Sequence, residues 1–357
     1  MAASSSKPTP KTVFVVGAGA SKEANLPIGS ELKKSIAKVL DIRFERGFQM
    51  VSGDHDIVEA LRVAVAGSDP QSRGINSFIH AGWRIRDAMP QAISVDNFID
   101  AHSGDKQIEL CGKLAIVRTI LEAEAKSYLF VEFLGDHRLK FGQLENTWFH
   151  SFVQLLTENC QSSDLATRLN SVALVIFNYD RCIEHYLYHA IQNYYAMSAS
   201  DVAHLLQGLE IYHPYGTVGS LPWLSRKNEI EFGATPYPKQ LLELASQIKT
   251  FTEGTDELSS DVNSIRSIMK TSHKLVFLGF AFHRLNIELL LPKTTSENPP
   301  TGRRVFSTAH GISKSDTDSI SAELANRGEL FVGNILIRND LTCSQLFREY
   351  WRSMSFT

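Results

Sequence analysis

The chain has 357 residues, of which 43% are apolar and 21% charged, a composition typical of a soluble protein with one large domain or two ordinary ones. Its formal net charge of −3 excludes the general attraction to nucleic acid or to an anionic membrane that a strongly basic chain would have. The four cysteines form no CxxC pair, so neither a zinc ribbon nor a disulfide scaffold is indicated, and we expect a cytoplasmic protein.

The N-terminal stretch "MAASSSKPTPK" (1–11) is rich in Ser, Pro and Lys and has no apolar core. We expect it to be a flexible leader rather than a targeting signal. No later segment approaches the length of a membrane span, so no membrane contact is predicted.

Short apolar runs predict a sheet that is buried on both faces. Their apolar character is continuous rather than alternating, which is typical of parallel strands, and helical patterns separate most of them. We therefore expect an α/β fold with a Rossmann-like, mostly parallel sheet. The predicted strands are 12–16, 172–177, 209–212, 274–280, 303–307 and 329–332.

The gap of about 155 residues between the first two strands is far longer than an ordinary crossover and must contain substructure. Amphipathic patterns over 106–130 and 141–160 predict long helices there. We expect a mostly helical subdomain inserted at about 35–165 into a Rossmann domain that spans 12–340. A C-terminal helix is expected at 341–357.

A turn of small residues follows the first strand. Small side chains let a ligand approach the backbone, and N–H groups at a helix start attract phosphate, although a tight strand-to-helix turn without a ligand is the structural alternative. Lys22 stands where the dinucleotide fingerprint has its third glycine, which disfavours a hydride-transferring dehydrogenase. The turn consists of Gly17, Ala18, Gly19, Ala20 and Ser21.

Polar residues also follow the second predicted strand, in the turn "FNYD". Asp180 fits an ordinary helix N-cap and Asn178 an Asx turn, which are the structural interpretations. The same two side chains stand at a strand end, where a ribose needs hydrogen-bonding partners in an open parallel sheet.

Two further turns carry candidate residues. His213 in "IYHPYG" ends a predicted strand, where a general base would have to sit, although a lone histidine is more often structural. Gly279 in "LGFAF" allows close backbone approach, and the neighbouring Phe280 is a candidate ligand contact that also fits the core. His185 and His189 lie one helical turn apart without an evident third ligand, so a packed or solvated helix face is favoured and no metal is expected.

From residue 12 to about 290 the chain resembles the sirtuin-like domain family, and more closely its bacterial branch of NAD-consuming defence proteins than the protein deacylases. The motifs that carry the resemblance are "GAGAS" with "NLPIG", "FNYD", "YHPYG", "LGFAF" and the acidic "SVDNFID" (94–100). The resemblance implies NAD⁺ as the substrate, bound in the crevice of a Rossmann-like sheet and cleaved between nicotinamide and ribose.

The resemblance also implies roles for individual residues. Gly17, Gly19 and Ser21 would hold the pyrophosphate and the nearby ribose. Asn178 and Asp180 occupy the family's Asn-x-Asp positions, where Asn178 would orient the nicotinamide ribose and the attacking water. His213 matches the catalytic histidine.

Two departures from the deacylases put acyl-lysine binding in doubt: "LPIG" (26–29) replaces a Pro-x-Phe-Arg element, and the four-cysteine zinc module is absent. We therefore expect an NAD⁺ hydrolase of antiphage defence, gated by self-association or by a partner such as the HerA-type ATPase or short Argonaute of other family members. Direct nucleic-acid binding is not expected. The alternatives are a module that senses NAD⁺ or ADP-ribose without cleavage and, with less support, a deacylase.

Overall fold

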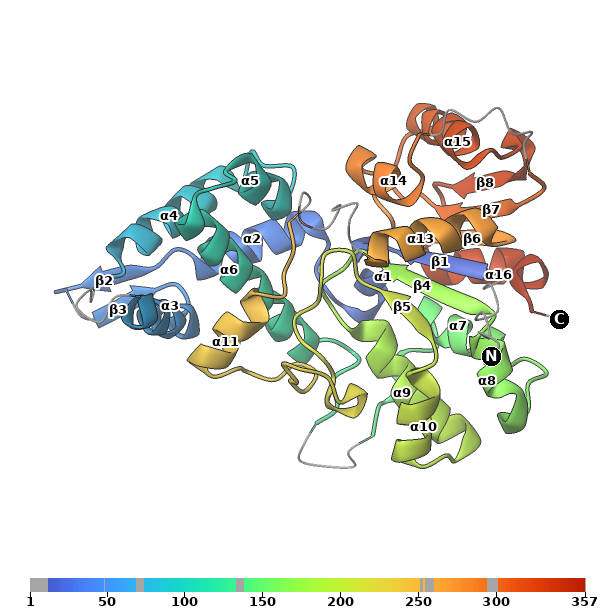
Figure 1. The fold of residues 1–357 in the computed structure, drawn as a ribbon, viewed down its shortest axis with the longest axis horizontal. Coiled ribbons are helices and arrows are strands. Elements are labelled where there is room, and N and C mark those ends of the chain that lie inside the picture. Colours follow the sequence, from blue (N-terminus) through green and yellow to red (C-terminus); the bar gives the residue numbers. More distant parts are fainter. Residues whose placement is uncertain are drawn as a thin grey trace, which may run out of the picture.

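A computed structural model describes residues 12–47, 49–68, 74–132, 138–250, 253, 260–293 and 301–356; the expected leader lies outside these residues. Six parallel strands form one sheet in the order β5-β4-β1-β6-β7-β8 (Figure 1). The predicted Rossmann-like α/β fold is thereby confirmed. The strands are β1 (Thr12–Val16), β4 (Val172–Ile176), β5 (Glu210–Tyr212), β6 (Lys274–Leu278), β7 (Arg304–Thr308) and β8 (Ile335–Arg338).

Helices cover both faces of the sheet, which explains why the apolar runs are continuous. Val13 and Val15 of β1 pack into one hydrophobic core, whereas Phe14 and Val16 pack into the other. The first face is covered by α13 (Ser260–Thr271), α14 (Arg284–Leu290) and α15 (Lys314–Gly328). The second is covered by α7 (Trp148–Thr157), α8 (Leu165–Leu169), α9 (Cys182–Tyr195), α10 (Ala199–Leu206) and α16 (Cys343–Met354).

The predicted strand at 329–332 is wrong. Glu329 ends α15 in the left-handed conformation with φ 52°, and the chain then turns through the 3₁₀ helix η5 (Val332–Asn334). Phe331 and Val332 are 54% and 60% exposed, so this apolar run lies outside the sheet. The edge strand β8 begins only at Ile335, once the chain has left the turn.

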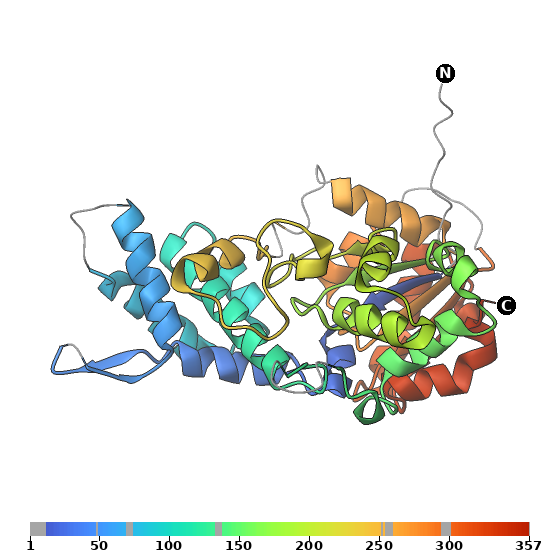
Figure 2. The same cartoon turned by 90° about the horizontal axis from the view of Figure 1, so that it is seen from below.

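A mostly helical lobe stands beside the sheet, as the insertion predicts (Figures 1 and 2). Its helix α6 is buried along much of its length and packs against α2, α3, α4 and α5. Helix α11, which follows β5 in the chain, joins this lobe against α3 and α6. The lobe consists of α2 (Gly29–Val39), the hairpin β2 (Arg43–Glu45) and β3 (Gln49–Ser52), α3 (His55–Ser68), α4 (Asn76–Ala88), α5 (Val95–Ala101), α6 (Lys106–Ala125) and α11 (Pro238–Ala245).

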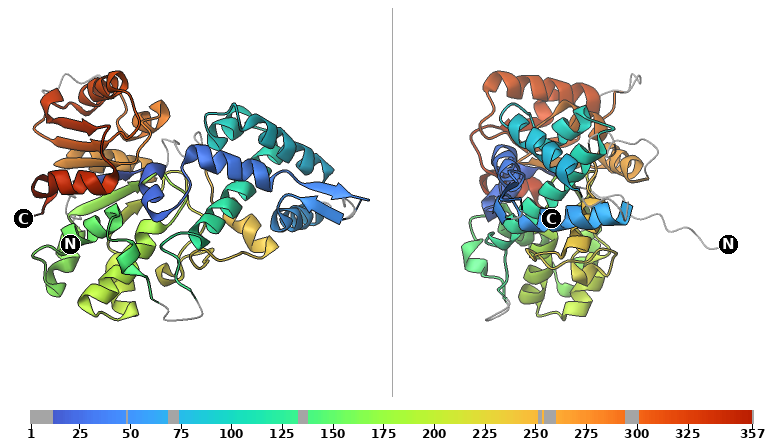
Figure 3. Two further views of the ribbon diagram at one scale, coloured as in Figure 1. Left: turned by 180° about the vertical axis from the view of Figure 1, so that it is seen from behind. Right: turned by 90° about the vertical axis from the view of Figure 1, so that its left-hand side faces the viewer.

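The later part of the insertion returns to the sheet. Helices α7 and α8 pack in the second core, and α16 lies directly against α7 (Figure 3). Of the expected 35–165 insertion, the part up to Ala125 therefore belongs to the lobe, whereas α7 and α8 cover the sheet. Within the described residues, no helix combines the length and apolar character needed to cross a membrane.

Candidate functional site

The glycine turn after β1 packs backbone to backbone against the turn after β6. The N–H of Gly17 donates to the carbonyl of Leu278 at 2.9 Å, and that of Gly19 to the carbonyl of Gly279 at 3.0 Å. A Cβ on Gly279, whose φ is +56°, would lie 2.0 Å from the nitrogen of Ala20, and one on Gly17 would lie 2.6 Å from the oxygen of Gly279. Glycine is therefore required here by the approach of the two turns, before any ligand is considered.

Two side chains, Trp148 of α7 and Glu23 just after the glycine turn, join that turn to the covering helices. The indole N–H of the fully buried Trp148 donates to the carbonyl of Ala20 at 3.0 Å. The carboxylate of Glu23 accepts from the backbone N–H of Trp148 at 2.6 Å and of Ser344 at 3.0 Å, at the first turns of α7 and α16. Burial raises the pKa of Glu23, although the two hydrogen bonds act to lower it. The glycine turn is thus fixed to both helices.

A cavity of about 570 Å³ opens beside the glycine turn. The predicted residues Ala18, Gly19, Gly279 and Phe280 line it, whereas five other predicted residues, from the glycine turn and the turn after β4, are buried and do not line it. Lys22 also lines the cavity, and its ammonium group pairs with Glu31 at 2.7 Å. Backbone, one cation and apolar surface are the elements that a nucleotide pocket combines. The buried residues are Gly17, Ala20, Ser21, Asn178 and Asp180.

A buried hydrogen-bonded cluster joins the glycine turn to the turn after β4. The hydroxyl of Ser21 donates to Asp180 Oδ2 at 2.8 Å and accepts from Asn178 Nδ2 at 2.9 Å. The other oxygen of Asp180 accepts from the backbone N–H of Cys182, the first residue of α9, at 3.2 Å. The N-cap of α9 is Arg181, so the prediction that Asp180 is the N-cap is wrong by one residue. Burial raises the pKa of Asp180. Residues that are about 160 positions apart in the chain therefore form one polar unit.

His213 lies on the far side of this cluster. Its Nε2 is 2.6 Å from Glu184 Oε1, and its Nδ1 is 3.4 Å from the backbone carbonyl oxygen of Asn178. The ring lines a second cavity of about 180 Å³, together with Arg181 and Lys227, and does not line the cavity beside the glycine turn. The structure thus brings His213 to the backbone of Asn178 but not into the first cavity.

A buried ion pair, which the sequence analysis did not anticipate, holds the Asn178 turn in place. The guanidinium of Arg181 pairs with the carboxylate of Glu124 from α6, and both side chains are almost fully buried. Glu124 also accepts from the backbone N–H groups of Arg181 at 3.2 Å and Gly233 at 3.0 Å. The pair therefore connects the helical lobe to the start of α9.

A second unanticipated cluster lies where the "SVDNFID" stretch meets the sheet. The hydroxyl of Tyr179 donates to Asp96 of α5, and that of Tyr215 donates to Asn286 Oδ1 at 2.5 Å. Burial raises the pKa of Asp96. Phe280 belongs to the same region, because its ring lies 5.1 Å from that of Phe177, which in turn lies 5.6 Å from the ring of Tyr215. The predicted ligand contact Phe280 thus lines the cavity and packs in the core at once.

The histidines of α9 form a packed helix face. The ring of His185 stacks on Phe232 at 4.1 Å, and its Nε2 is 3.0 Å from the carbonyl of Leu129. Burial lowers the pKa of both His185 and His189. Among the residues that the structure describes, no group of three or more His, Cys, Asp or Glu side chains is placed to hold a metal ion.

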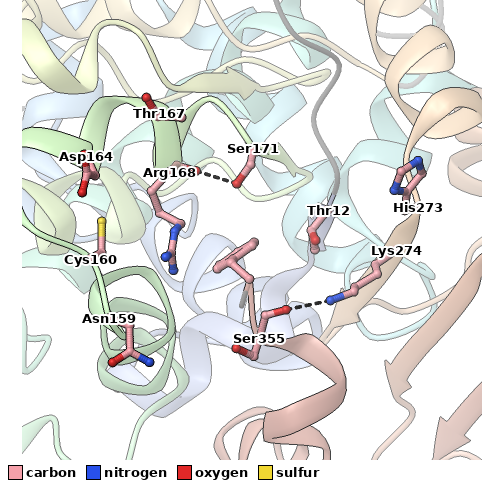
Figure 4. A pocket seen from close by; sticks show the side chains of 11 residues that line it. Thr12, Asn159, Cys160, Asp164, Thr167, Arg168, Ser171, His273, Lys274 and Ser355 are labelled. Carbon is pink, nitrogen blue, oxygen red and sulfur yellow. Dashed lines mark hydrogen bonds between the residues drawn. The ribbon is translucent and has the colours of Figure 1, made fainter.

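Another cavity, of about 480 Å³, lies at the opposite end of the sheet (Figure 4). Its cations are bonded to backbone carbonyls that follow helix ends: Arg168 Nη1 donates to Glu158 at 3.2 Å, and Lys274 Nζ donates to Ser355 at 2.8 Å. Cations at helix C-termini have this structural role in many proteins. None of the predicted site residues lines this cavity.

No family model matches the chain, and no curated protein matches it either.

Proposed function

We propose that the chain binds NAD⁺ at the carboxyl end of its sheet and hydrolyses it to nicotinamide and ADP-ribose. The observation that supports this most is the buried cluster in which Asp180, Ser21 and Asn178 are hydrogen-bonded, with His213 Nδ1 3.4 Å from the backbone carbonyl of Asn178. Ligands of open parallel sheets bind beyond the carboxyl ends of the strands, at the point where the order of the strands reverses. β1 has that position, between β4 and β6.

Each part of the site has a role in this reaction. The cavity beside the glycine turn would take the adenine nucleotide half, with Lys22 near the pyrophosphate. Departure of nicotinamide leaves a ribosyl centre with positive charge, so a nucleophile must be aimed at one face. Asn178 would orient the ribose and the attacking water, and His213 would accept a proton, which is worth about 10²–10⁴-fold in rate.

Binding without cleavage is the second candidate, and one observation favours it. His213 lines a different cavity from the glycine turn, and the amide of Asn178 already donates to Ser21. A module that senses NAD⁺ or ADP-ribose would need the glycine turn but no base at position 213. Hydrolysis requires that the ligand displace part of the cluster or that the two cavities join.

Nicotinamide release by the purified chain separates the two candidates. We expect Asn178→Ala and His213→Ala to fold and bind NAD⁺ but to lose at least about 10²-fold in release. Asn193→Ala and His204→Ala, at exposed positions of α9 and α10, are the matched controls. Turnover at the wild-type rate in either site variant refutes the catalytic assignment, and tight NAD⁺ binding without release by the wild type favours the sensing module.

We also propose that the activity is gated, because unregulated loss of NAD⁺ would poison the host cell. The gate is self-association or a defence partner, for which a HerA-type ATPase is the first protein to test. Light scattering on the purified chain measures self-association directly. Release that is weak alone and rises with the partner supports the gate, whereas full release by a strict monomer contradicts it.

A further inference from the structure

We infer that Glu184 is a positioning residue for His213, which holds the ring proton on Nε2 and leaves Nδ1 as the proton acceptor; this inference rests on the proposed NAD⁺ hydrolysis. Glu184 is absent from the motifs that suggested the site. It lies in the first turn of α9, four residues after Asp180, whereas His213 follows β5.

The two ring nitrogens of His213 face two acceptors at very different distances. N–H···O bonds are about 2.7–3.2 Å long, and those to a carboxylate lie at the short end. The Nε2 contact with Glu184, at 2.6 Å, is therefore a strong bond, whereas the Nδ1 contact with the carbonyl of Asn178, at 3.4 Å, is outside the usual range. A neutral imidazole has one N–H, so the shorter contact with the carboxylate determines where it is.

Burial makes this contact important for both partners. The side chains of His213 and Glu184 are 12% and 7% exposed, so little water competes for the bond. The second oxygen of Glu184 is buried and has no hydrogen-bond partner among the described residues. A buried carboxylate that loses a donor bears a desolvation cost, which favours the ring orientation that supplies the Nε2 proton.

The orientation has a chemical consequence for the proposed reaction. With Nε2 held by Glu184, the lone pair of Nδ1 on the other side of the ring faces the Asn178 backbone. That is the turn where the ribose and the attacking water are proposed to bind. A carboxylate that fixes the tautomer of a basic histidine is the same arrangement as in hydrolases with a catalytic triad, with the roles of the two ring nitrogens exchanged.

The tautomer itself can be measured without any assay of hydrolysis. In a sample with ¹⁵N-labelled histidine, the signal that disappears in His213→Ala belongs to His213. We expect that signal in the wild-type chain to show a proton on Nε2 and none on Nδ1. A proton on Nδ1, alone or together with one on Nε2, overturns the inference, even if NAD⁺ is hydrolysed.

Glu184→Gln tests whether the tautomer matters for catalysis. The amide has nearly the same shape but can donate to Nε2, so the ring proton is free to move to Nδ1, where it faces the carbonyl of Asn178. We expect the ¹⁵N signal of His213 to change and kcat to fall at least about 10²-fold with little change in KM. Glu210→Gln is the matched control, because this carboxylate on β5 is not the hydrogen-bond partner of either ring nitrogen of His213.

The outcomes separate this inference from the proposed function. An unchanged His213 signal in Glu184→Gln overturns the positioning role, as does a changed signal with wild-type kcat. If the wild-type chain binds NAD⁺ without cleaving it, hydrolysis fails, while the tautomer measurement still decides how Glu184 holds the ring.

Discussion

The two ends of the same sheet hold cavities of similar size, about 570 Å³ at the carboxyl end and about 480 Å³ at the amino end. At the carboxyl end, side chains from the turns after two different strands bond to one another, as Ser21 after β1 does with Asn178 and Asp180 after β4. At the amino end, Arg168 and Lys274 donate instead to backbone carbonyls at the ends of α7 and α16, and not to other side chains of the site. Convergence of polar side chains, and not cavity volume, therefore distinguishes the candidate site.

The largest loss of stability is expected from Arg181→Ala, at the carboxyl end. The substitution leaves Glu124 buried and without its guanidinium partner, which costs about 3–5 kcal/mol in the free energy of unfolding. Urea unfolding measures this loss, and in the double variant with Glu124→Ala the two losses should be far from additive. A loss below about 1 kcal/mol in the single variant would show that the pair is not the connection we describe.

Gly279→Ala is expected to cost about 2–4 kcal/mol and to abolish NAD⁺ binding. Its Cβ would meet the nitrogen of Ala20 at 2.0 Å, and its positive φ strains any side chain. Gly67→Ala in α3 is the matched control, because a Cβ there meets nothing within 4 Å and alanine favours a helix. Calorimetric titration with NAD⁺ checks the loss of binding, and binding at wild-type affinity would contradict the close approach of the two turns.

Asp180→Asn is expected to change how stability depends on pH. Because burial raises the pKa of Asp180 in the folded chain, the folded state retains a proton at pH values where the unfolded state has lost it. Wild-type stability therefore falls as pH rises from the ordinary pKa of aspartate through the raised one, by at most about 1.4 kcal/mol per pH unit for one group.

The variant lacks this loss, so its stability relative to the wild type should increase with pH over that window. Asp340→Asn is the opposite control, since Arg338 lowers the pKa of that exposed carboxyl. Unfolding measured from about pH 2 to about pH 8 gives both differences, because the window of Asp340 lies below the ordinary pKa of aspartate, about 3.9, and that of Asp180 lies above it. A relative stability of Asp180→Asn that decreases with pH contradicts the buried environment of this carboxyl.

The smallest effects are expected at the amino end. Arg168→Ala and Lys274→Ala each remove hydrogen bonds to backbone carbonyls, which are worth about 0.5–1.5 kcal/mol. NAD⁺ binding and nicotinamide release should stay at wild-type levels in both variants. A loss of binding in either one would remove the distinction between the two ends of the sheet.

Periodicity predicted the sheet well, because both faces are buried and the apolar runs are short. It was wrong at 329–332, because the left-handed cap at Glu329 ends α15 inside that run and the exposed Phe331 belongs to a turn. An apolar run alone does not show how many of its residues belong to the end of the preceding helix and the turn after it.

The candidate site was predictable only in part. Gly17, Asn178 and His213 stand at strand ends, and the topology brings their turns together. Glu184 and Glu124 were not predicted as site residues, because each lies in a helix whose pattern is that of an ordinary amphipathic helix. Their partners, His213 and Arg181, are 29 and 57 residues away in the chain. A charged residue in the buried part of such a helix was the one local signal.

The bond between the indole of Trp148 and the carbonyl of Ala20 gives the chain an intrinsic optical probe. Tryptophan emission depends on the immediate surroundings of the ring, and this ring is shielded from solvent beneath the turn where nucleotide is expected. Titrating unlabelled protein with NAD⁺ should change its fluorescence, and the change should vanish in Trp148→Phe, while Trp83, Trp223 and Trp351 supply a constant background. Occupancy of the pocket can thus be followed in real time without a chemical label.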